Sequence, residues 1–385
     1  MEKISLFAVH MPHAIDKPLL ETLHSGYIGQ GPKVEEFESE LAKWIGFKNL
    51  LATNSGTSAL QLALRIDGIG SVNGGRVVDE VITTPMTCTA SNMPILAAGA
   101  VPVFADISPV SGMIDPLDVE RKITRNTKAI LHVHWGGVVN PGLGKLRDLS
   151  REYGLSLIED AAHAFGAVAD TGKIGNCTAD YTAFSFQAIK HITTGDGGLL
   201  SVSDSIDYKR GKLLRWYGID RETDKKDFRC EEDIEEWGLK WHMNDICAAI
   251  GLEQLKYANG IIQKHRDNAS IIWESIDRER FQPAFSETDL SSGAFWLFTV
   301  LLKSSVDRLW FMEHLRKQGI QTSQVHARND KHTVFAPYVQ GKLPGVDHFT
   351  ERMVCIPCHW NLDALGLDRI ISACRSYKVL DSVGI

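Results

Sequence analysis

Long hydrophobic runs are what this 385-residue sequence lacks most plainly. No segment offers about eighteen consecutive uncharged apolar residues, the length that a membrane-spanning helix requires. The first residues, Met-Glu-Lys-Ile-Ser-Leu-Phe-Ala, lack the basic start and the apolar core of a secretory signal. We therefore expect a soluble protein, without a membrane partner, located in the cytoplasm.

A surplus of basic residues is also missing. The chain has 41 Lys and Arg against 48 Asp and Glu, which gives a formal net charge of -7. Binding to a polyanionic duplex depends on a basic stripe, and this balance does not provide one. We therefore expect no nucleic acid partner.

Cysteine is scarce for a disulfide-stabilised protein. Seven cysteines, an odd number, are scattered through a chain that is too long to need disulfides, so we expect reduced thiols. One spacing, Cys355-Ile-Pro-Cys358-His359, fits covalent haem attachment. A short strand that ends at a proline explains it better, because no export segment accompanies it.

Apolar runs of strand length alternate with segments of helical period along most of the chain. Such alternation is typical of repeated βαβ units and a largely parallel sheet. The expected strands are 49–53, 80–84, 101–106, 128–134, 155–159, 182–187 and 198–203. The expected helices include 57–65, 90–98, 143–153, 244–257 and 261–276.

We predict an α/β fold with two domains. Helices sandwich a mostly parallel seven-stranded sheet in the large domain, and a smaller α+β domain follows. The chain is longer than one compact core usually holds, and the strict alternation fades after residue 257. We place the large domain at 1–255 and the small C-terminal domain at 256–385.

Gly56, Thr57 and Ser58 follow a strand-like run and begin a helix. Unpaired backbone N–H groups and the helix dipole converge at such a point and make an anion site. Gly56 permits close approach of a phosphate, and the two hydroxyls can donate to its oxygens. Ordinary N-capping gives the same pattern, so the motif gains force only from the residues downstream.

Asp160 ends the buried-strand pattern Leu155-Ser-Leu-Ile-Glu-Asp160. It should lie at the carboxyl edge of the sheet, where ligands of open α/β folds bind. If a cofactor with a pyridine ring binds at this edge, the carboxylate favours the protonated form of the ring nitrogen. His163 is placed to bond a ring hydroxyl, but a histidine satisfied by local backbone is an equally good interpretation.

Lys190 follows the strand-like run Thr182-Ala-Phe-Ser185-Phe on a glycine-rich turn that includes Gly195. We expect it to be semi-buried. Desolvation and a nearby cation depress the pKa of an amine and free it to attack a carbonyl. A solvated surface cation is the usual fate of a lysine. A lysine, a strand-end aspartate and a phosphate-binding helix start together predict a pyridoxal phosphate site.

Six stretches resemble the DegT/DnrJ/EryC1/StrS family of sugar aminotransferases, which have the aspartate aminotransferase fold. They extend nearly from end to end of the chain. The stretches are Gly26–Glu38, Asn54–Leu60, Gly99–Asp106, Glu159–Ala167, the Lys190 segment and Trp241–Leu255.

The resemblance implies a homodimer with active sites at the subunit interface, glutamate as the amino donor and a nucleotide-diphosphate keto sugar as the acceptor. It makes Lys190 the catalytic Schiff-base lysine. It also implies that Thr57, Ser58 and Ser185 hold the phosphate and that Asp160 meets the ring nitrogen.

By the same resemblance, His163 lies near the ring hydroxyl and Lys240 reaches the neighbouring subunit's phosphate. Lys240 departs from the family, which often has asparagine there. Cys88 stands where the family stacks an aromatic ring on the cofactor, and His242 stands where an arginine is frequent. A thiol is a small, soft contact, so either another side chain covers that face or the cofactor is held mainly by its phosphate and by Asp160.

The implied reaction has two halves, in which the cofactor alternates between pyridoxal phosphate and pyridoxamine phosphate. It yields an amino-deoxy sugar nucleotide. A sugar 3-dehydratase of the same fold, suggested by His191, and a non-catalytic binding homologue are the alternatives. The dehydratase replaces the Schiff-base lysine by histidine, whereas Lys190 is present here.

Three further residues are candidates for the sugar pocket. They are Trp135, His326 and Arg328. Trp135 is as well explained as a core residue, and His326 is more often a surface or packing residue than a substrate contact. No residue identifies the nucleotide or the position of the ketone, and we expect no metal in the site.

Overall fold

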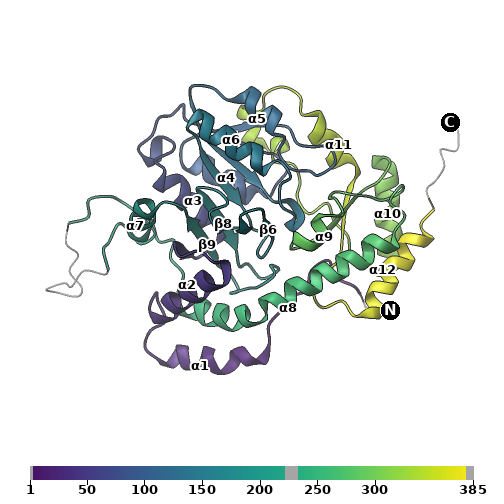
Figure 1. Cartoon of the computed structure of the whole chain (residues 1–385), viewed down its shortest axis with the longest axis horizontal. Coiled ribbons are helices and arrows are strands. Elements are labelled where there is room, and N and C mark those ends of the chain that lie inside the picture. The colour runs from purple at the N-terminus through teal and green to yellow at the C-terminus, as the bar shows by residue number, and fades with distance from the viewer. Residues whose placement is uncertain (1–2, 222–232, 379–385) are drawn as a thin grey trace.

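A seven-stranded sheet lies at the centre of the structure (Figure 1). The structure is a computed structural model that describes residues 3–221 and 233–378. The strand order is β1-β9-β8-β5-β4-β2-β3, and all pairings are parallel except those of β9 with β1 and β8. The strands are β1 (Leu50–Thr53), β2 (Glu80–Thr83), β3 (Val101–Phe104), β4 (Thr127–Val133), β5 (Ser156–Asp160), β8 (Tyr181–Ser185) and β9 (Gly198–Val202). The predicted α/β fold class is confirmed.

Helices cover both faces of this sheet because successive strand residues are apolar on both sides. In β1, Leu50 packs in one apolar cluster and Leu51 in another. The first face is covered by α2 (Pro32–Ile45), α6 (Leu143–Tyr153) and α8 (Asp245–Ser275). The second face is covered by α3 (Gly56–Ile66), α4 (Thr89–Ala97) and α7 (Ser205–Leu214). Continuous apolar runs are what a sheet buried on both faces requires.

A three-stranded antiparallel sheet forms the core of the C-terminal part, with the order β10-β11-β12. The strands are β10 (Gln282–Pro283), β11 (Phe298–Leu301) and β12 (Met353–Ile356). The remaining α-helices of the described chain are α1 (Asp16–His24), α5 (Pro116–Lys122), α9 (Asp289–Ser292), α10 (Ser305–Lys317), α11 (Pro344–Arg352) and α12 (Ala364–Ser376). The short strands β6 (Val168–Ala169) and β7 (Gly172–Lys173) pair with each other. As expected, Cys355 lies in a strand that ends before Pro357.

The predicted domain boundary between residues 255 and 256 lies inside α8. Ile4 and Leu6, from the start of the chain, pack in the C-terminal apolar cluster, and Ile4 pairs with Ile320. The start of the chain therefore packs with the C-terminal part, and the division into two domains stays a prediction.

Helix α8 is one continuous element of 31 residues, which runs from α2 to α12 (Figure 1). The expectation of two stretches, 244–257 and 261–276, was wrong on this point. Gly260 lies between them, and a glycine inside a helix costs only about 1 kcal/mol, which tertiary packing overrides. Within the described parts of the chain, no helix, α8 included, has the length and apolarity to cross a membrane.

Asp245, the first residue of α8, caps the start of α2. Its carboxylate accepts backbone N–H groups from Gly31 at 2.8 Å, Lys33 at 3.2 Å and Val34 at 3.1 Å. The Asp245 side chain is fully buried, and it satisfies three N–H groups that a helix start leaves without an intrahelical partner. Two of the stretches that carry the family resemblance thus lock together through one carboxylate.

Replacing Asp245 with alanine should lower the free energy of unfolding by about 3 kcal/mol, because three backbone donors, one buried and two partly buried, lose their acceptor. The matched control is Asp115→Ala, which removes the cap of α5 and its one bond to the Leu117 amide. That change should cost about 1 kcal/mol. Denaturant unfolding at one protein concentration measures both, and equal losses would contradict the capping role.

Candidate active site

The carboxyl ends of β1, β5 and β8 meet at one edge of the sheet, and α3 begins there. A Cβ at Gly56 would lie 3.0 Å from Ser185 Cβ, so the absence of a side chain lets the helix start rest on the end of β8. The amides of Gly56 and Thr57 have no acceptor among the described residues. Two free N–H groups at a helix start are a ready anion site.

The three hydroxyls predicted to hold a phosphate lie around this helix start but differ in their partners. Ser58 Oγ donates to Asn54 Oδ1 at 2.6 Å and also contacts Ser55 Oγ at 2.8 Å. The hydroxyls of Thr57 and Ser185 donate to no acceptor within residues 3–221 and 233–378. Thr57 and Ser185 are therefore free to donate to a bound anion, whereas Ser58 mainly shapes the loop.

Asp160 is the last residue of β5 and is buried. Its Oδ2 accepts from Ser91 Oγ at 2.5 Å, and its Oδ1 accepts from the Ala162 amide at 3.0 Å. Ser91 in turn contacts Thr87 Oγ1 at 2.7 Å. The carboxylate is thus held in one orientation and keeps acceptor capacity on both oxygens. Sequence reasoning missed Ser91 because serines in helices seldom signal a role.

Lys190 lies at the same edge, on the turn after β8, and its side chain is semi-buried as expected. Burial lowers the pKa of its ammonium to about 8, while the charges of Asp160 and Cys88 oppose that shift. The amine has no hydrogen bond or ion pair with any described residue; its Nζ lies 3.8 Å from the centroid of a Trp296 ring. A desolvated, unpaired amine is what a nucleophilic lysine requires.

His163 belongs to a stack of aromatic rings beside Lys190. It stacks on Trp296 with ring centroids 3.9 Å apart and on His326 with centroids 5.6 Å apart. Trp135 packs edge-on against both histidines at 6.1 and 6.0 Å, and its indole donates to Thr299. Buried His163 Nδ1 and His326 Nε2 have no partner among the described residues, so both can bond a ligand.

Both histidines are neutral near pH 7. Burial, followed by the charge of Lys190, holds the pKa of His163 well below its usual range. Burial also lowers the pKa of His326 to about 4, and Lys190 adds to that shift. Neutral imidazoles recognise hydroxyl groups by hydrogen bonding and do not attract anions.

Cys88 immediately precedes α4, makes no side-chain capping bond and is partly buried. Its loop is held by Asn329, whose Nδ2 donates to the Thr87 carbonyl at 2.8 Å and whose Oδ1 accepts from Asn92 at 2.8 Å. Asn329 comes from the C-terminal part of the chain, in the short helix Asn329–Lys331. Sequence reasoning missed Asn329, since no local pattern marks a contact over such a separation.

Lys240 and His242 lie next to the α3 start. Lys240 is exposed, and its carbonyl accepts from Asn54 Nδ2 at 2.9 Å. The His242 ring stacks on Trp216 with centroids 3.9 Å apart, and Arg221 lies over the Trp216 ring at 3.7 Å. Burial, followed by the charge of Arg215, lowers the pKa of His242 to about 4, so position 242 provides a neutral ring and not a cation.

Arg328 is engaged by two carboxylates. Its Nε and Nη2 bond both oxygens of Asp330 at 2.7 Å, and its Nη1 pairs with Asp347. The guanidinium is therefore occupied within the fold. The structure does not bring it together with Lys190, whereas His163, His326 and Trp135 lie in one cluster with that lysine.

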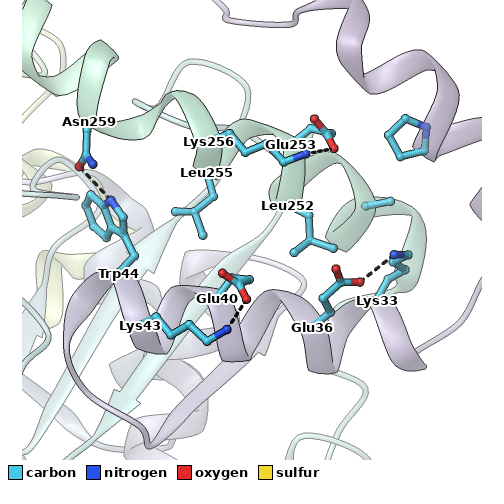
Figure 2. Close-up of a pocket in the computed structure, with 12 residues that line it drawn as sticks. Lys33, Glu36, Glu40, Lys43, Trp44, Leu252, Glu253, Leu255, Lys256 and Asn259 are labelled. Carbon is cyan, nitrogen blue, oxygen red and sulfur yellow. Dashed lines mark hydrogen bonds and ion pairs between the residues drawn. The ribbon is translucent and has the colours of Figure 1, made fainter.

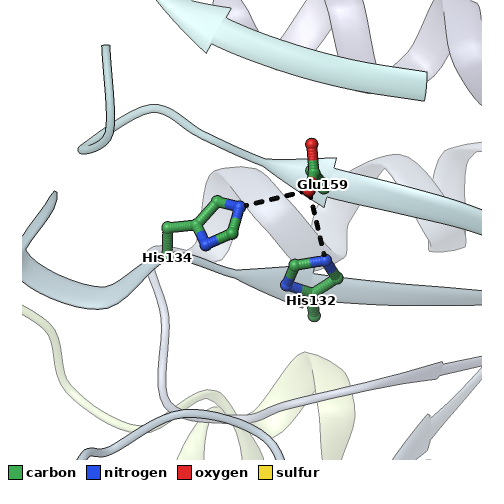
Figure 3. Close-up of side chains that lie close together, drawn as sticks. All are labelled: His132, His134 and Glu159. Carbon is green, nitrogen blue, oxygen red and sulfur yellow. Dashed lines mark ion pairs between the residues drawn. The ribbon is translucent and has the colours of Figure 1, made fainter. Parts of the chain in front are cut away.

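A second polar cluster consists of His132, His134 and Glu159 (Figure 3). Because Glu159 and Asp160 are successive residues of β5, this cluster lies on the other face of the sheet from Asp160. His132, His134 and Glu159 are fully buried, and both rings point at Glu159 Oε1, with Nε2 atoms 3.9 and 3.4 Å away. Oε2 accepts from Thr178 Oγ1 at 2.5 Å and Thr182 Oγ1 at 2.6 Å.

The donor set of this cluster does not fit a metal ion. His134 Nδ1 accepts the Asn140 amide at 3.0 Å, so the neutral ring carries its proton on Nε2, the atom that faces Glu159. Metal binding at Nε2 would move the proton to Nδ1, against another donor. The cluster is better described as a buried carboxylate facing a histidine N–H.

An open groove of about 530 Å³ lies between α1, α2 and α8, away from these residues (Figure 2). Each lysine that lines it is paired with a glutamate of its own helix: Lys33 with Glu36, Lys43 with Glu40 and Lys256 with Glu253. No predicted site residue lines the groove. Its charges are compensated, and it offers no chemistry comparable to that around Lys190.

A protein-family model described as the DegT/DnrJ/EryC1/StrS aminotransferase family matches residues 11–375. The chain belongs to this family. It is 33% identical over 374 residues to the UDP-4-amino-4,6-dideoxy-N-acetyl-beta-L-altrosamine transaminase of Helicobacter pylori, covering 94% of this chain and 96% of that relative. The predicted family is confirmed.

Solved structures of similar chains agree with this membership of the DegT/DnrJ/EryC1/StrS family. AtS13 from Actinomadura melliaura is 36% identical, with a TM-score of 0.89 over 98% of this chain and 100% of that chain. Spr1654 from Streptococcus pneumoniae, solved in a PLP-form, is 26% identical, with a TM-score of 0.86 over 97% of this chain and 98% of that chain. The whole fold, and not one domain alone, is shared.

Glu159→Gln should destabilise the protein at neutral pH but not in acid. Burial raises the pKa of Glu159, but His134, His132 and Thr178 outweigh it and lower the pKa to about 2. A depressed carboxyl pKa stabilises the fold above the unfolded value and loses this effect as pH falls toward the folded value. The difference from wild type should therefore reach on the order of 3 kcal/mol above pH 5 and shrink between about pH 4.5 and 2.

Urea unfolding at several pH values measures this difference. Glu152→Gln, at an exposed position of α6, is the matched control and should show no such trend. A Glu159→Gln defect that is constant from pH 3 to 7 would contradict an ionised, stabilising carboxylate.

Proposed function

We propose that the protein is a pyridoxal phosphate-dependent aminotransferase that moves an amino group from glutamate to a nucleotide-linked keto sugar. The product is an amino-deoxy sugar nucleotide. Membership of the family and the UDP-sugar transaminase among the relatives support this class of reaction. The observation that carries the proposal is the desolvated, unpaired Lys190 amine, whose pKa responds to the charge of Asp160.

The residues around Lys190 fit pyridoxal phosphate. The bound cofactor supplies an aldehyde for the lysine and a ring that withdraws electrons from the reacting carbon. The free amides at the start of α3, with Thr57 and Ser185, would hold its phosphate. Asp160 would meet the ring nitrogen, and His163 offers a neutral ring with an unpartnered Nδ1 for the ring hydroxyl.

Lys190 has two tasks in this proposal. Because its pKa is lowered to about 8, part of the amine is unprotonated near neutral pH and can attack a carbonyl. When Lys190 is not linked to the cofactor, the same Nζ would take the proton from Cα of glutamate, and in the second half of the reaction it would give a proton to the sugar carbon. Asp160 stays oriented throughout because Ser91 and Ala162 bond its two oxygens.

We also propose a homodimer, as the family resemblance implies. Lys240 is exposed in the single chain while its backbone is tied to Asn54, two residues before the α3 start. An exposed cation at this place is suited to contact the phosphate bound by a second subunit. Glutamate and the nucleotide sugar are the proposed small-molecule partners.

The alternative of a sugar 3-dehydratase loses its motivating residue. His191 is buried, and its Nε2 lies 2.8 Å from the Ala294 carbonyl oxygen, to which it must donate. The ring is thus occupied in packing. His191 Nδ1 has no partner among the described residues, but burial lowers the pKa of the ring to about 4. Lys190 is therefore the stronger base of the two, which favours transamination.

Lys190→Ala should abolish turnover, by at least about a thousandfold, because the group that moves the proton is lost. The visible absorbance of the lysine-linked cofactor should disappear as well. Lys209→Ala, at an exposed position of α7, is the matched control and should change neither property. Persistence of both absorbance and turnover in Lys190→Ala would end the proposal.

Incubation with glutamate and a set of nucleotide keto sugars should give an amino sugar and 2-oxoglutarate. Mass spectrometry of the sugar product separates the candidates. A deoxy keto sugar with release of ammonia would favour the dehydratase. A purified protein that is colourless with added cofactor, and inert toward glutamate, would favour a non-catalytic homologue.

A further inference from the structure

Trp296 lies against Lys190 although it comes from the C-terminal part of the chain, just before β11. One of its ring centroids is 3.8 Å from Lys190 Nζ. Its indole Nε1–H donates to the Ile189 carbonyl at 2.8 Å. One side chain thus contacts both the lysine amine and the backbone next to it.

The residue after Lys190 is tied to the same segment. His191 Nε2 donates to the Ala294 carbonyl at 2.8 Å, and the ring is buried. Ile189 and His191 flank Lys190, and both are bonded to residues of the segment 294–296. Lys190 therefore lies between two anchored neighbours, with the Ile189 carbonyl bonded to Trp296 and the His191 side chain bonded to Ala294.

The segment 294–296 is itself held in place. His265 of α8 donates from Nδ1 to the Phe295 carbonyl at 2.7 Å, and the Ala294 amide donates to Gly137 at 2.7 Å. Phe295 has a φ of 47°, a left-handed conformation that residues other than glycine rarely adopt. Such a conformation persists only where the surroundings hold it.

The Trp296 ring is also restrained by its neighbours. Phe7 stacks on it with centroids 4.6 Å apart, and His163 stacks with centroids 3.9 Å apart. The indole is almost completely buried. It cannot rotate without losing both stacks and the bond to Ile189, so it is a rigid surface for the lysine.

We propose that Trp296 is a positioning residue for Lys190: its ring face favours the charged lysine nitrogen, and its N–H holds the backbone that carries it. The proposal rests on the proposed function, because it concerns the nitrogen that links the cofactor. An aromatic face attracts a cation, most strongly where water is excluded. It also gives the site an aromatic side chain although position 88 is a cysteine.

The test is a pH titration of the visible absorbance of the holoenzyme, which reports protonation of the lysine nitrogen in its cofactor-linked form. Trp296→Leu should lower the midpoint by up to about one pH unit, and Trp296→Phe by less, because phenylalanine keeps a weaker ring face. In both variants kcat should fall by about 10- to 100-fold, because the lysine is displaced. The KM for glutamate should change far less. A midpoint that is unchanged or higher in both variants overturns the proposal.

The chain offers a matched control pair. Lys173 Nζ lies 3.7 Å from a Trp44 ring centroid, and the Trp44 indole donates to Asn259 at 3.0 Å. Trp44→Phe and Trp44→Leu remove the same kinds of contact outside the site and should leave the midpoint unchanged. If they shift it as much as the Trp296 variants do, the effect is general and the proposal fails.

Two further variants keep the outcomes distinguishable. If Trp296→Leu does not fold, as judged by thermal melting, Trp296→Phe carries the measurement, and His191→Leu should also lower kcat by loosening the segment 294–296. Lys190→Ala tests the proposed function separately. Loss of absorbance in Lys190→Ala together with wild-type titration of the Trp296 variants refutes only the role of Trp296.

Discussion

The close approach of the α3 start to the ends of β8 and β9 is the constraint on which the site depends. A Cβ at residue 198 would lie 2.4 Å from the Ser55 carbonyl carbon. Relieving this clash would require the backbone of the packed sheet or of the loop to move. A Cβ at residue 56 would lie 3.0 Å from Ser185 Cβ. Because both are glycines, the free amides of the helix and the Ser185 hydroxyl face one point. Larger residues would separate them and leave the anion site incomplete.

Two neighbouring carboxylates of β5 have different environments because successive side chains of a strand point to opposite faces. Glu159 is fully buried on the α2 and α6 face, where Thr178 and Thr182 bond its Oε2 and His134 faces its Oε1. Asp160 lies on the α3 and α4 face, where two donors orient it without exhausting its acceptors. The buried pair thus separates a carboxylate that stabilises the sheet from one that is available to a ligand.

The periodic parts of this fold could be predicted from the sequence because their signals are local. The helix expected at 143–153 has those bounds, and Asp160 and Lys190 lie near the ends of strands as expected. The continuity of α8 through Gly260 could not be predicted, since the pattern does not distinguish a tolerated glycine from a break. The contact of Trp296 with Lys190 could not be predicted for another reason. In the sequence, a tryptophan just before a strand cannot be distinguished from a core residue until its distant neighbours are known.

The surroundings of Lys190 are completed by residues from beyond α8. Trp296 bonds to the backbone at Ile189, and Asn329 holds the loop that carries Cys88. Helix α8, with no break along its 31 residues, connects these segments to the large sheet. The bonds at Ile189 and Ala294 cross between the two parts, so the position of the segment before β11 is coupled to that of Lys190. Residues of the C-terminal part therefore line the candidate site.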